Sequence, residues 1–531
     1  MSPTTTRSAY VPSVDYRQFI GGDWVAGRTT FDAVDPSVGS TWAELPQGSA
    51  DDVETAVASA LRAFASWRRT THDQRQAVLL AIADRFEASG EHFGPLLATE
   101  NGRPVREAAI ADIPTVKAIF RFYAGVIRAF NGEQIPLANP DTLLYTKREP
   151  LGVVAAIISW NSPLITLANK IAPALAGGNT VVVKPSEYAS ASVLEFVRLI
   201  ADLLPAGVLN VVTGVGPETG AALVSHPDVA KITFTGGPET ARAILGSAAQ
   251  TLRPSLMELG GKGPMIVAAD ADLDLAVQDA LMGIYLANGE ACIASSRLLL
   301  HDDVHDEFVE RFAAVARRIK VGDATDQASE MGPLVSRRQL ELVQGHVERA
   351  RAEGVSVIVG DEPLDLDASL SGGFFQRPVL LADPDGRATI TRTEVFGPVT
   401  IAERYRSDEE AIARANQSRY GLAAGVWTRD LRRAHQFADQ LDAGIVWVNR
   451  WFDLPPGMPM GGRGDSGFGR ELSFETLREY TAVKSVNIDL SVARPPLWGL
   501  AEGCRGAPSV DQPGVLSCED DVSRRLDRAG S

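Results

Sequence analysis

The chain has 531 residues, enough for roughly three domains of 100–200 residues each, and its 45% hydrophobic and 22% charged residues are typical of a globular protein with a large core. Its net charge of −16 argues against a nucleic-acid groove and against a general affinity for anionic membranes. No apolar run approaches the roughly 20 residues that span a bilayer, the N-terminus lacks the apolar core of a secretory signal, and three cysteines make no disulfide framework, so we expect a soluble cytoplasmic enzyme.

The N-terminal part of the chain carries a helical pattern. Between Asp51 and Asn101, apolar residues such as Val53, Val57 and Phe64 recur at three- and four-residue steps, and the pattern resumes after a break. This pattern predicts two amphipathic helices that pack on a core.

From Gly152 to Gly261, short apolar runs alternate with helical stretches. Strands are predicted at Val153–Ser159, Thr180–Lys184, Leu209–Thr213, Lys231–Thr235 and Ser255–Leu259, and helices at Leu167–Leu175, Ser190–Leu204, Glu218–Val224 and Glu239–Ala249. This alternation predicts a parallel, doubly wound sheet with right-handed crossovers. Such a sheet binds its ligand outside the carboxyl ends of its strands.

A second α/β series follows. Strands are predicted near Met265–Ala268, Arg297–His301, Val355–Gly360, Val399–Tyr405 and Gly444–Asn449, with helices over Leu273–Asn288, Asp306–Lys320 and Asp408–Gln417. The first of these helices is expected to end at the Asn-Gly pair just before Cys292. Cys292 is therefore expected on a turn after a helix, near the boundary between the two α/β units, where enzyme sites are common.

Residues 491–531 have a different texture. Prolines and glycines recur in this segment, and few large apolar residues remain. We expect a disordered or loosely packed tail. Cys504 and Cys518 lie in it, and we expect them to be unpaired in a reducing compartment.

Cys292 and Glu258 are the two residues most indicative of chemistry. A thiol nucleophile and a separate carboxylate base suffice for acyl chemistry, because the thiol can form a thioester and the carboxylate can activate the water that cleaves it. The alternative for a lone cysteine is a small buried hydrophobe. The turn at Asn288-Gly289 and the small Ala291 favour the nucleophile.

Histidines and glycines give weaker indications. None of the seven histidines lies in a comparable turn, which disfavours a cysteine–histidine pair. His301 and His305 have a spacing that suits a metal, but they lie at the start of an acidic helix, and we predict no metal site. Glycine-rich turns at Gly214 and Gly236 open helices whose backbone amides could bind phosphate, although neither matches the G-x-G-x-x-G fingerprint.

From about residue 17 to 490 the chain closely resembles the NAD(P)-dependent aldehyde dehydrogenase superfamily. The resemblance is carried by eight motifs in the family's order: Ser159–Leu164 (SWNSPL), Ala172–Thr180 (APALAGGNT), Lys184–Glu187 (KPSE), Phe234–Gly236 (FTG), Glu258–Lys262 (ELGGK), Asn288–Cys292 (NGEAC), Glu394–Val399 (EVFGPV) and Pro459–Glu471 (PMGG followed by SGFGRE).

The resemblance implies catalytic roles for four residues. Cys292 is the expected nucleophile on the aldehyde carbonyl, and the side-chain amide of Asn161 with the backbone N–H of Cys292 is the expected oxyanion hole. Glu258 is the expected base for the water that cleaves the thioester. Lys170 matches a lysine that joins the proton relay in some members.

The resemblance also implies NAD as the cofactor. Lys184 and Glu187 are similar to the pair that grips the adenosine ribose, and Glu394 and Phe396 to the pair that seats the nicotinamide ribose. Because Glu187 should repel a 2′-phosphate, NAD is expected rather than NADP. The expected cofactor residues are Ser159, Trp160, Lys184, Ser186, Glu187, Gly214, Gly236, Gly237, Leu259, Gly260, Glu394 and Phe396.

The implied substrate is a small-molecule aldehyde. Positions that match the family's substrate tunnel are Ser162, Asn169, Leu286, Trp451, Leu454 and Met460. Several are smaller than the aromatic residues often found there, which predicts a roomy pocket for a medium or large aldehyde. Arg450 could pair with the carboxylate of a semialdehyde, and the alternative is a surface arginine.

The implied fold is α/β and aldehyde dehydrogenase-like, with a Rossmann-type parallel-sheet cofactor domain, an α/β catalytic domain and a small β oligomerisation arm. We expect the NAD-binding domain at residues 17–130 and 151–261, the catalytic domain at 262–458 and the arm at 131–150 and 475–490. Exposed strand edges of such an arm tend to be covered by a partner subunit, so we expect a homodimer or homotetramer.

Two departures from the family pattern leave the reacting groups in place. The family usually has glutamine where this chain has Glu290, and proline where it has Ser159. Two other reactions stay open. Some relatives transfer the acyl group to coenzyme A, but they typically lack the base that Glu258 would supply. A cofactor-free thiol hydrolase could use the same cysteine and carboxylate, so NADH formation from an aldehyde separates it from a dehydrogenase.

Overall fold

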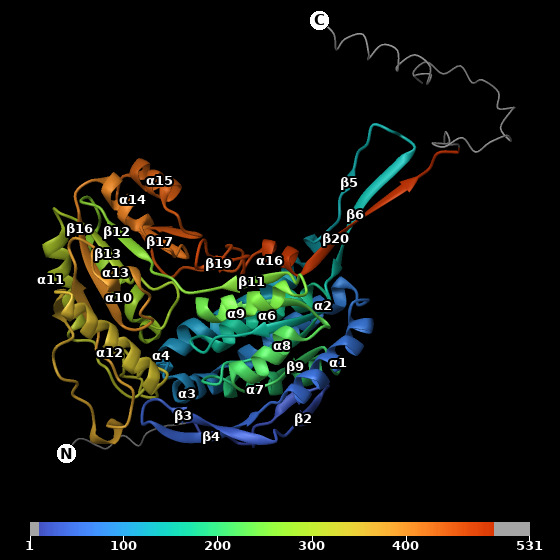
Figure 1. Cartoon of the computed structure of the whole chain (residues 1–531), viewed down its shortest axis with the longest axis horizontal. Coiled ribbons are helices and arrows are strands. Elements are labelled where there is room, and N and C mark those ends of the chain that lie inside the picture. The colour runs from blue at the N-terminus through green and yellow to red at the C-terminus, as the bar shows by residue number, and fades with distance from the viewer. Residues whose placement is uncertain (1–9, 493–531) are drawn as a thin grey trace, which may run out of the picture. The chain divides into compact units, whose positions relative to one another are not determined.

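Short apolar strands build the larger main sheet of this structure, a computed structural model that describes residues 10–492 (Figure 1). Its central strands are parallel, whereas β1, β2 and β19 pair antiparallel at the edges. The predicted parallel sheet is therefore confirmed, and each of its predicted strands overlaps an observed one. In spatial order the sheet contains β19 (Gly467–Phe468), β11 (Ser255–Glu258), β10 (Val229–Thr235), β7 (Val153–Ile157), β8 (Thr180–Lys184), β9 (Leu209–Val211), β1 (Gln18–Ile20) and β2 (Asp23–Val25).

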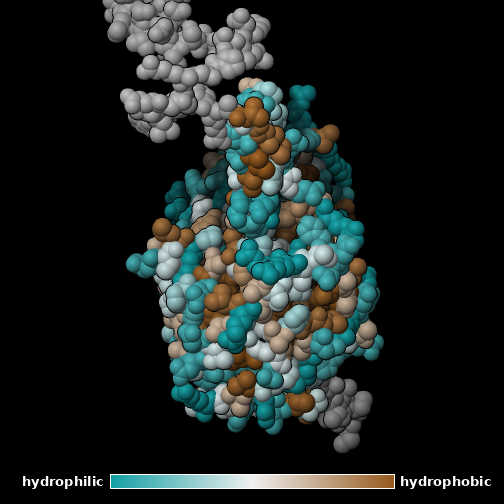
Figure 2. Space-filling view, turned by 90° about the vertical axis from the view of Figure 1, so that its right-hand side faces the viewer, coloured by the Kyte–Doolittle hydropathy of each residue, from teal (hydrophilic) through white to brown (hydrophobic). Residues whose placement is uncertain are grey.

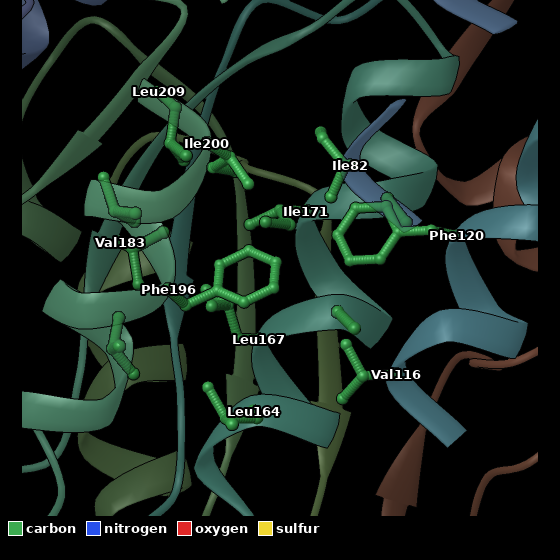
Figure 3. Packing of buried hydrophobic residues seen from close by; sticks show 14 of the residues in the cluster. Ile82, Val116, Phe120, Leu164, Leu167, Ile171, Val183, Phe196, Ile200 and Leu209 are labelled. Atoms are coloured by element: carbon green, nitrogen blue, oxygen red, sulfur yellow. The ribbon is translucent and has the colours of Figure 1, made fainter. Parts of the chain in front are cut away.

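Helices cover both faces of this sheet because its strands are apolar on both sides. Val153 and Ala155 belong to one hydrophobic cluster, and Val154 and Ala156 belong to the other. Successive side chains of a strand point to opposite faces, so one apolar run supplies two cores. The first cluster includes α1 (Ala50–Trp67), α8 (Ala221–Ser225) and α9 (Pro238–Ala249), and the second includes α2 (His72–Ala88), α5 (Ile113–Val126), α6 (Pro163–Ala176) and α7 (Ala191–Ile200), as Figure 3 shows for part of it.

The N-terminal region holds more elements than the sequence pattern predicted. Three helices, α1, α2 and α3 (Gly90–Asn101), stand where two were predicted. The third is buried on nearly all sides and contains Pro95, so it lacks the amphipathic period on which the prediction relied. Strands β3 (Thr29–Asp35) and β4 (Ser40–Gln47), which pair in a separate two-stranded sheet, were also not predicted.

The strands of the second main sheet are also apolar on both faces, and helices cover both sides of it. Met265 and Val267 pack with α10 (Leu273–Tyr285) and α11 (His305–Ala316), whereas Ile266 faces the opposite cluster. That opposite cluster includes α14 (Asp408–Asn416) and α15 (Leu431–Gln440). In spatial order the sheet contains β14 (Ser356–Val359), β15 (Val379–Ala382), β16 (Val399–Tyr405), β13 (Arg297–His301), β12 (Pro264–Val267), β17 (Ala423–Trp427) and β18 (Ile445–Val448), all parallel except β14.

Three features of this second part correct the sequence-based expectations. Strands β15 and β17 were not predicted; β17 consists largely of Ala and Gly, which are depleted in strands. Helix α12 (Arg337–Ala352) is mostly polar and buries only a narrow stripe, so it was also not predicted. Helix α10 ends at Tyr285 instead of Asn288, because Ala287 and Asn288 have left-handed φ values of 52° and 58°.

The chain divides into two compact units, Met1–Gly132 with Lys147–Lys484, and Glu133–Thr146 with Ser485–Ser531. Both main sheets belong to the first unit. The second unit contains β5 (Gln134–Ile135) and parts of β6 (Thr142–Pro150) and β20 (Thr481–Asp489), in a sheet of order β20-β6-β5. β20 follows α16 (Phe474–Glu479).

The strands of the second unit lie within the predicted arm and carry exposed apolar side chains. Ile135, Leu137, Ile488 and Leu490 are each more than a third exposed, and hydrophobic residues form a brown patch in the upper part of Figure 2. Within the described residues, every helix is too short or too polar to span a bilayer. The predicted tail from residue 493 onward, with Cys504 and Cys518, lies outside the described residues.

Two neighbouring leucines in α2 test the assignment of the buried face. Leu79 is fully buried in the core, whereas Leu80 is 39% exposed. We expect Leu79→Ala to lower the free energy of unfolding by about 2–5 kcal/mol and Leu80→Ala by less than about 1 kcal/mol. The two variants change helix propensity equally, so their difference reports burial. Unfolding by guanidinium, followed by tryptophan fluorescence, measures it. Equal losses would contradict the assignment.

Candidate active site

Cys292 follows a left-handed turn that one side chain holds in place. Asn288 has a φ of 58°, a conformation that asparagine adopts more readily than most residues. Its Nδ2 donates to Gly102 O at 2.9 Å and to Pro333 O at 2.8 Å, and its Oδ1 accepts from Gly332 N at 2.7 Å. This buried amide therefore ties the turn to two segments that are distant in sequence. Cys292 lies on a turn after a helix, as predicted.

The amide of Asn161 lies next to the same turn. Its Nδ2 donates to Glu290 O at 2.8 Å, and its Oδ1 accepts from Ser159 Oγ at 2.8 Å. The Ser159 hydroxyl thus orients the amide, which a proline at that position could not do. Because an amide nitrogen carries two hydrogens, a second N–H of Asn161 is available to an oxygen atom of a ligand beside Cys292.

Glu290 stands where the resembled family has glutamine, and its side chain is buried. Its Oε1 accepts a hydrogen bond from Val335 N at 3.0 Å. Burial raises the pKa of Glu290 well above its ordinary value, against the hydrogen bond from Val335, which lowers it. In its protonated form this carboxyl group can both donate and accept, as the amide of glutamine does.

Glu258, at the end of β11, is buried and its carboxyl oxygens have no hydrogen-bond partner among the described residues. Burial first, and then the charge of Glu471, raise the pKa of Glu258 well above its ordinary value, while Lys170 opposes the shift. Burial and the charges of Glu258 and Glu394 raise the pKa of the Cys292 thiol to about 12. The structure thus brings the predicted nucleophile and base together, and burial favours the protonated form of each.

Lys170 is fully buried in α6 and has two partners. Its Nζ lies 2.7 Å from Glu471 Oε1 and 3.1 Å from Thr233 Oγ1. Within this ion pair, Lys170 lowers the pKa of Glu258, whereas Glu471 raises it. Glu471 is a residue of the site that the sequence reasoning did not single out. Its one signal was its place at the end of the last family motif.

Glu394 and Phe396 lie on the loop before β16, close to the turn after Glu258. Glu394 Oε1 accepts from Gly261 N at 2.8 Å, and burial raises the pKa of Glu394 to about 7. A Cβ at Gly260 would lie 1.9 Å from Glu394 Oε2, so only glycine fits there. The ring of Phe396 meets that of Trp160 edge to face at 5.2 Å.

A second group of predicted cofactor residues lies along the carboxyl edge of the larger sheet. Lys184 ends β8, and in register it neighbours Ile157 of β7. Its side chain is 4% exposed, and its Nζ lies 3.5 Å from Glu187 Oε2. Burial lowers the pKa of Lys184, so a further anionic or hydroxyl partner would favour its charged form.

Three glycines at this edge differ in the space that surrounds their backbone. A Cβ at Gly237, which precedes α9, would meet no described atom within 4 Å, whereas one at Gly236 would lie 2.4 Å from the ring of Phe234. Gly214 has a φ of 132°, and a Cβ there would lie 2.4 Å from Thr219 Oγ1. The helix start at Gly237 is therefore an accessible set of backbone donors, as phosphate binding needs.

Two other predicted cofactor residues, Ser186 and Leu259, form hydrogen bonds that stabilise the local backbone. Ser186 Oγ accepts from Tyr188 N at 3.4 Å within the turn after β8. Leu259 N donates to Ser466 O at 3.1 Å and so joins β11 to the glycine-rich segment near residue 466.

The predicted substrate-pocket residues differ in exposure. Trp451 is 1% exposed, and its Nε1 donates to Ile293 O at 3.0 Å, so it braces the turn that carries Cys292. Arg450 is exposed and pairs with Asp453 at 3.1 Å, which agrees with its interpretation as a surface arginine. The half-buried members of the set are Ser162, Leu286, Leu454 and Met460.

Asn169 is the last of the predicted substrate-tunnel positions. Asn169 is buried in α6, and its Oδ1 has no hydrogen-bond partner among the described residues. Residues 10–492 contain no group of three or more His, Cys, Asp or Glu side chains arranged to hold a metal ion.

The raised pKa of Cys292 makes its reactivity depend on pH. Because a pKa of about 12 leaves the thiolate a minor species throughout, we expect the alkylation rate with iodoacetamide in the ligand-free protein to rise about tenfold per pH unit from pH 7 to 10. Mass spectrometry of the peptide that carries Cys292 separates its rate from those of Cys504 and Cys518. A plateau below about pH 9 would contradict the raised pKa.

Comparisons with known proteins agree with this geometry. Residues 24–486 match the model of the aldehyde dehydrogenase family. The chain is 41% identical over 481 residues to the (Z)-2-((N-methylformamido)methylene)-5-hydroxybutyrolactone dehydrogenase of Acinetobacter baylyi, covering 90% of this chain and 97% of that protein. Its sequence is 40% identical to that of PnpE from Pseudomonas sp. WBC-3. The crystal structure of PnpE matches this structure with a TM-score of 0.89, covering 91% of this chain and 100% of PnpE. A structure of PnpE in complex with nicotinamide adenine dinucleotide is also similar. Its sequence is 40% identical, the match covers 91% of this chain and 99% of that chain, and the TM-score is 0.89. The chain belongs to the aldehyde dehydrogenase family.

Proposed function

We propose that this protein oxidises an aldehyde to the carboxylic acid with NAD, through a thiohemiacetal and a thioester on Cys292. The observation that carries the proposal is that the Asn161 amide is hydrogen-bonded to the turn before Cys292, while the charge of the Glu258 carboxyl group acts on the Cys292 thiol. Membership of the aldehyde dehydrogenase family supports the reaction class, an NAD(P)-dependent oxidation.

The residues of the larger sheet fit NAD. Lys184 and Glu187 would hold the adenosine ribose, the open helix start at Gly237 would receive the phosphates, and Glu394 with Phe396 would hold the nicotinamide ribose. When bound, NAD supplies the hydride acceptor of the reaction. The carboxylate of Glu187 disfavours the 2′-phosphate of NADP by like-charge repulsion, and the NAD complex of PnpE supports the same choice.

Cys292 and Asn161 carry the first half of the reaction. The Cys292 thiol loses its proton to solvent, and the resulting thiolate forms a bond to the aldehyde carbon while the carbonyl electron pair moves to oxygen. The free N–H of the Asn161 amide and the backbone N–H of Cys292 stabilise the resulting oxyanion. When the C–O double bond forms again, the carbon loses its hydride, and a thioester remains on the sulfur.

Glu258 carries the second half. Burial and the charge of Glu471 raise its pKa, while Lys170 opposes the shift, so its carboxylate is a stronger base than an ordinary one. It takes a proton from a water molecule whose oxygen bonds to the thioester carbon. The carbon–sulfur bond then breaks, the carboxylic acid leaves, and the electron pair returns to Cys292 as thiolate.

The same proposal assigns roles to the parts of the fold. Residues 17–130 and 151–261 form the NAD-binding domain, and residues 262–458 form the catalytic domain. The segments 131–150 and 475–490 form an arm whose exposed apolar side chains, such as Ile488 and Leu490, would be covered in a homodimer or homotetramer. For the substrate, Leu286, Leu454 and Met460 would line a pocket for a medium or large aldehyde.

Absorbance of NADH with a panel of aldehydes tests the reaction. We expect the wild-type chain to form NADH, and Asn161→Ala to lower kcat by about 10²–10³-fold through loss of an oxyanion donor. Asn416→Ala, which alters an exposed amide, is the matched control and should keep the wild-type kcat. No NADH from any aldehyde, with cleavage of a simple ester retained, would overturn the proposal in favour of a thiol hydrolase.

The nucleotide preference has its own test. Glu187→Gln removes the charge that repels a 2′-phosphate, so we expect the ratio of kcat/KM for NAD over NADP to fall at least about tenfold, which corresponds to about 1.4 kcal/mol. Glu348→Gln, an exposed change on α12, should leave the ratio unchanged. An unchanged ratio in Glu187→Gln would contradict the role of this carboxylate.

A further inference from the structure

The short segment from Asn101 to Glu107 touches both sides of the site. It runs from the last residue of α3 to the end of α4 (Val105–Glu107). On one side, Asn101 Nδ2 donates to Trp160 O at 3.0 Å. On the other, Gly102 O accepts from Asn288 at 2.9 Å. One stretch of backbone therefore contacts both the residue before Asn161 and the turn before Cys292.

Arg103 makes the contact with Asn161 itself. Its Nη1 lies 3.2 Å from Ser162 Oγ and 3.5 Å from Asn161 O. The side chain is almost fully buried, as is its main partner Asp112, whose Oδ2 lies 2.6 Å from Arg103 Nε. Asp112 ends a π-helical turn, Ala108–Asp112, a conformation frequent at functional sites.

Glu107 links Arg103 to the other side. Its Oε2 accepts from Ala287 N at 2.9 Å and lies 3.8 Å from Arg103 Nε. Burial raises the pKa of Glu107 to about 7, and the charge of Arg103 opposes that shift. The contacts form a continuous path from Asn161 through Arg103 and Glu107 to the turn at Ala287 that precedes Cys292.

Burying a guanidinium group costs free energy unless carboxylates and hydrogen bonds compensate it. Simple stabilisation could be supplied by an apolar side chain of similar volume. The buried charge of Arg103 is thus better explained by the geometry that it fixes. Its Nε lies beside Asp112 while its Nη1 reaches the carbonyl of Asn161 and the hydroxyl of Ser162.

We propose that Arg103 is a positioning residue for the oxyanion hole, which holds the backbone of Asn161 in register with the turn that carries Cys292. The proposal rests on the proposed function of Asn161. Arg103 touches no reacting atom in it; it acts through Asn161, and a small displacement of that amide is enough to lower the rate by about 10–100-fold.

A double-mutant cycle with the full-length chain tests this role. We expect Arg103→Met to lower kcat/KM for the aldehyde by about 10–100-fold in the wild-type background and by less than about 3-fold in Asn161→Ala, since the amide on which it acts is then gone. The KM for NAD should stay within about twofold of wild type. Arg106→Met is the matched control, because Arg106 lies three residues further along the chain, in α4, but is exposed, and it should change neither value.

Arg103→Lys keeps the positive charge beside Asp112 but loses the fork. We expect it to retain the thermal unfolding midpoint of the wild type while losing rate as Arg103→Met does, so it completes the cycle if Arg103→Met does not fold. Equal losses in both backgrounds, an unchanged rate in Arg103→Met, or full activity in Arg103→Lys would overturn the proposal.

Cleavage of p-nitrophenyl acetate separates this proposal from the proposed oxidation. The ester also passes through an oxyanion on the Cys292 adduct but needs no NAD. If the wild-type chain forms no NADH, the oxidation is refuted. The double-mutant cycle of Arg103→Met and Asn161→Ala can then be measured on ester cleavage. A loss of rate that largely disappears in Asn161→Ala supports the role of Arg103, and equal losses in both backgrounds overturn it.

Discussion

The buried amide of Asn288 is the constraint on which the site depends. It holds a left-handed turn whose backbone strain is of the order of 1–3 kcal/mol, against three hydrogen bonds that each contribute about 1 kcal/mol. The strain is stored directly before Cys292, where a regular helix would carry the thiol away from Asn161. The helix therefore has to end at Tyr285, and the segments at Gly102 and Pro333 have to approach the turn.

Burial and ion pairing both act on the acidic groups around this turn. Glu258 and Glu290 are buried with raised pKa values, so their carboxyl groups favour the protonated form. Lys170 and Glu471 cancel each other in a buried pair. Limited solvent favours the transfer of hydride and protons between bound groups over their loss to water. In the proposed mechanism, Glu258 acts as a carboxylate and becomes neutral when it takes a proton from water, whereas the oxyanion carries its negative charge on the adduct.

Much of the fold could be predicted because parallel strands buried on both faces appear in a sequence as short apolar runs. Thr180–Lys184 and Arg297–His301 were predicted with their observed bounds for this reason. Helix α3 was missed because burial on nearly all sides leaves no amphipathic period, and strand β17 because three of its five residues are Ala or Gly, which are depleted in strands. Asparagine followed by glycine likewise indicated the turn before Cys292.

The reacting residues could be inferred from motifs, but their supports could not. Cys292, Glu258 and Asn161 lie in motifs whose residue types fit acyl chemistry. Arg103 and Glu107, by contrast, act across more than 50 residues of sequence, through contacts that only the packed chain brings together. No local pattern distinguishes such a buried ion pair from surface charges on a short helix.

The mass of the adduct on Cys292 tests the central claim most directly. The Glu258→Gln variant, mixed with NAD and an aldehyde and quenched in acid, should carry on the Cys292 peptide the mass of the aldehyde less two hydrogens, which is that of a thioester. The aldehyde's full mass would mark an adduct that has not been oxidised, and an unmodified peptide with NADH formed in solution would mean that Cys292 is not the nucleophile. Either result would contradict the account.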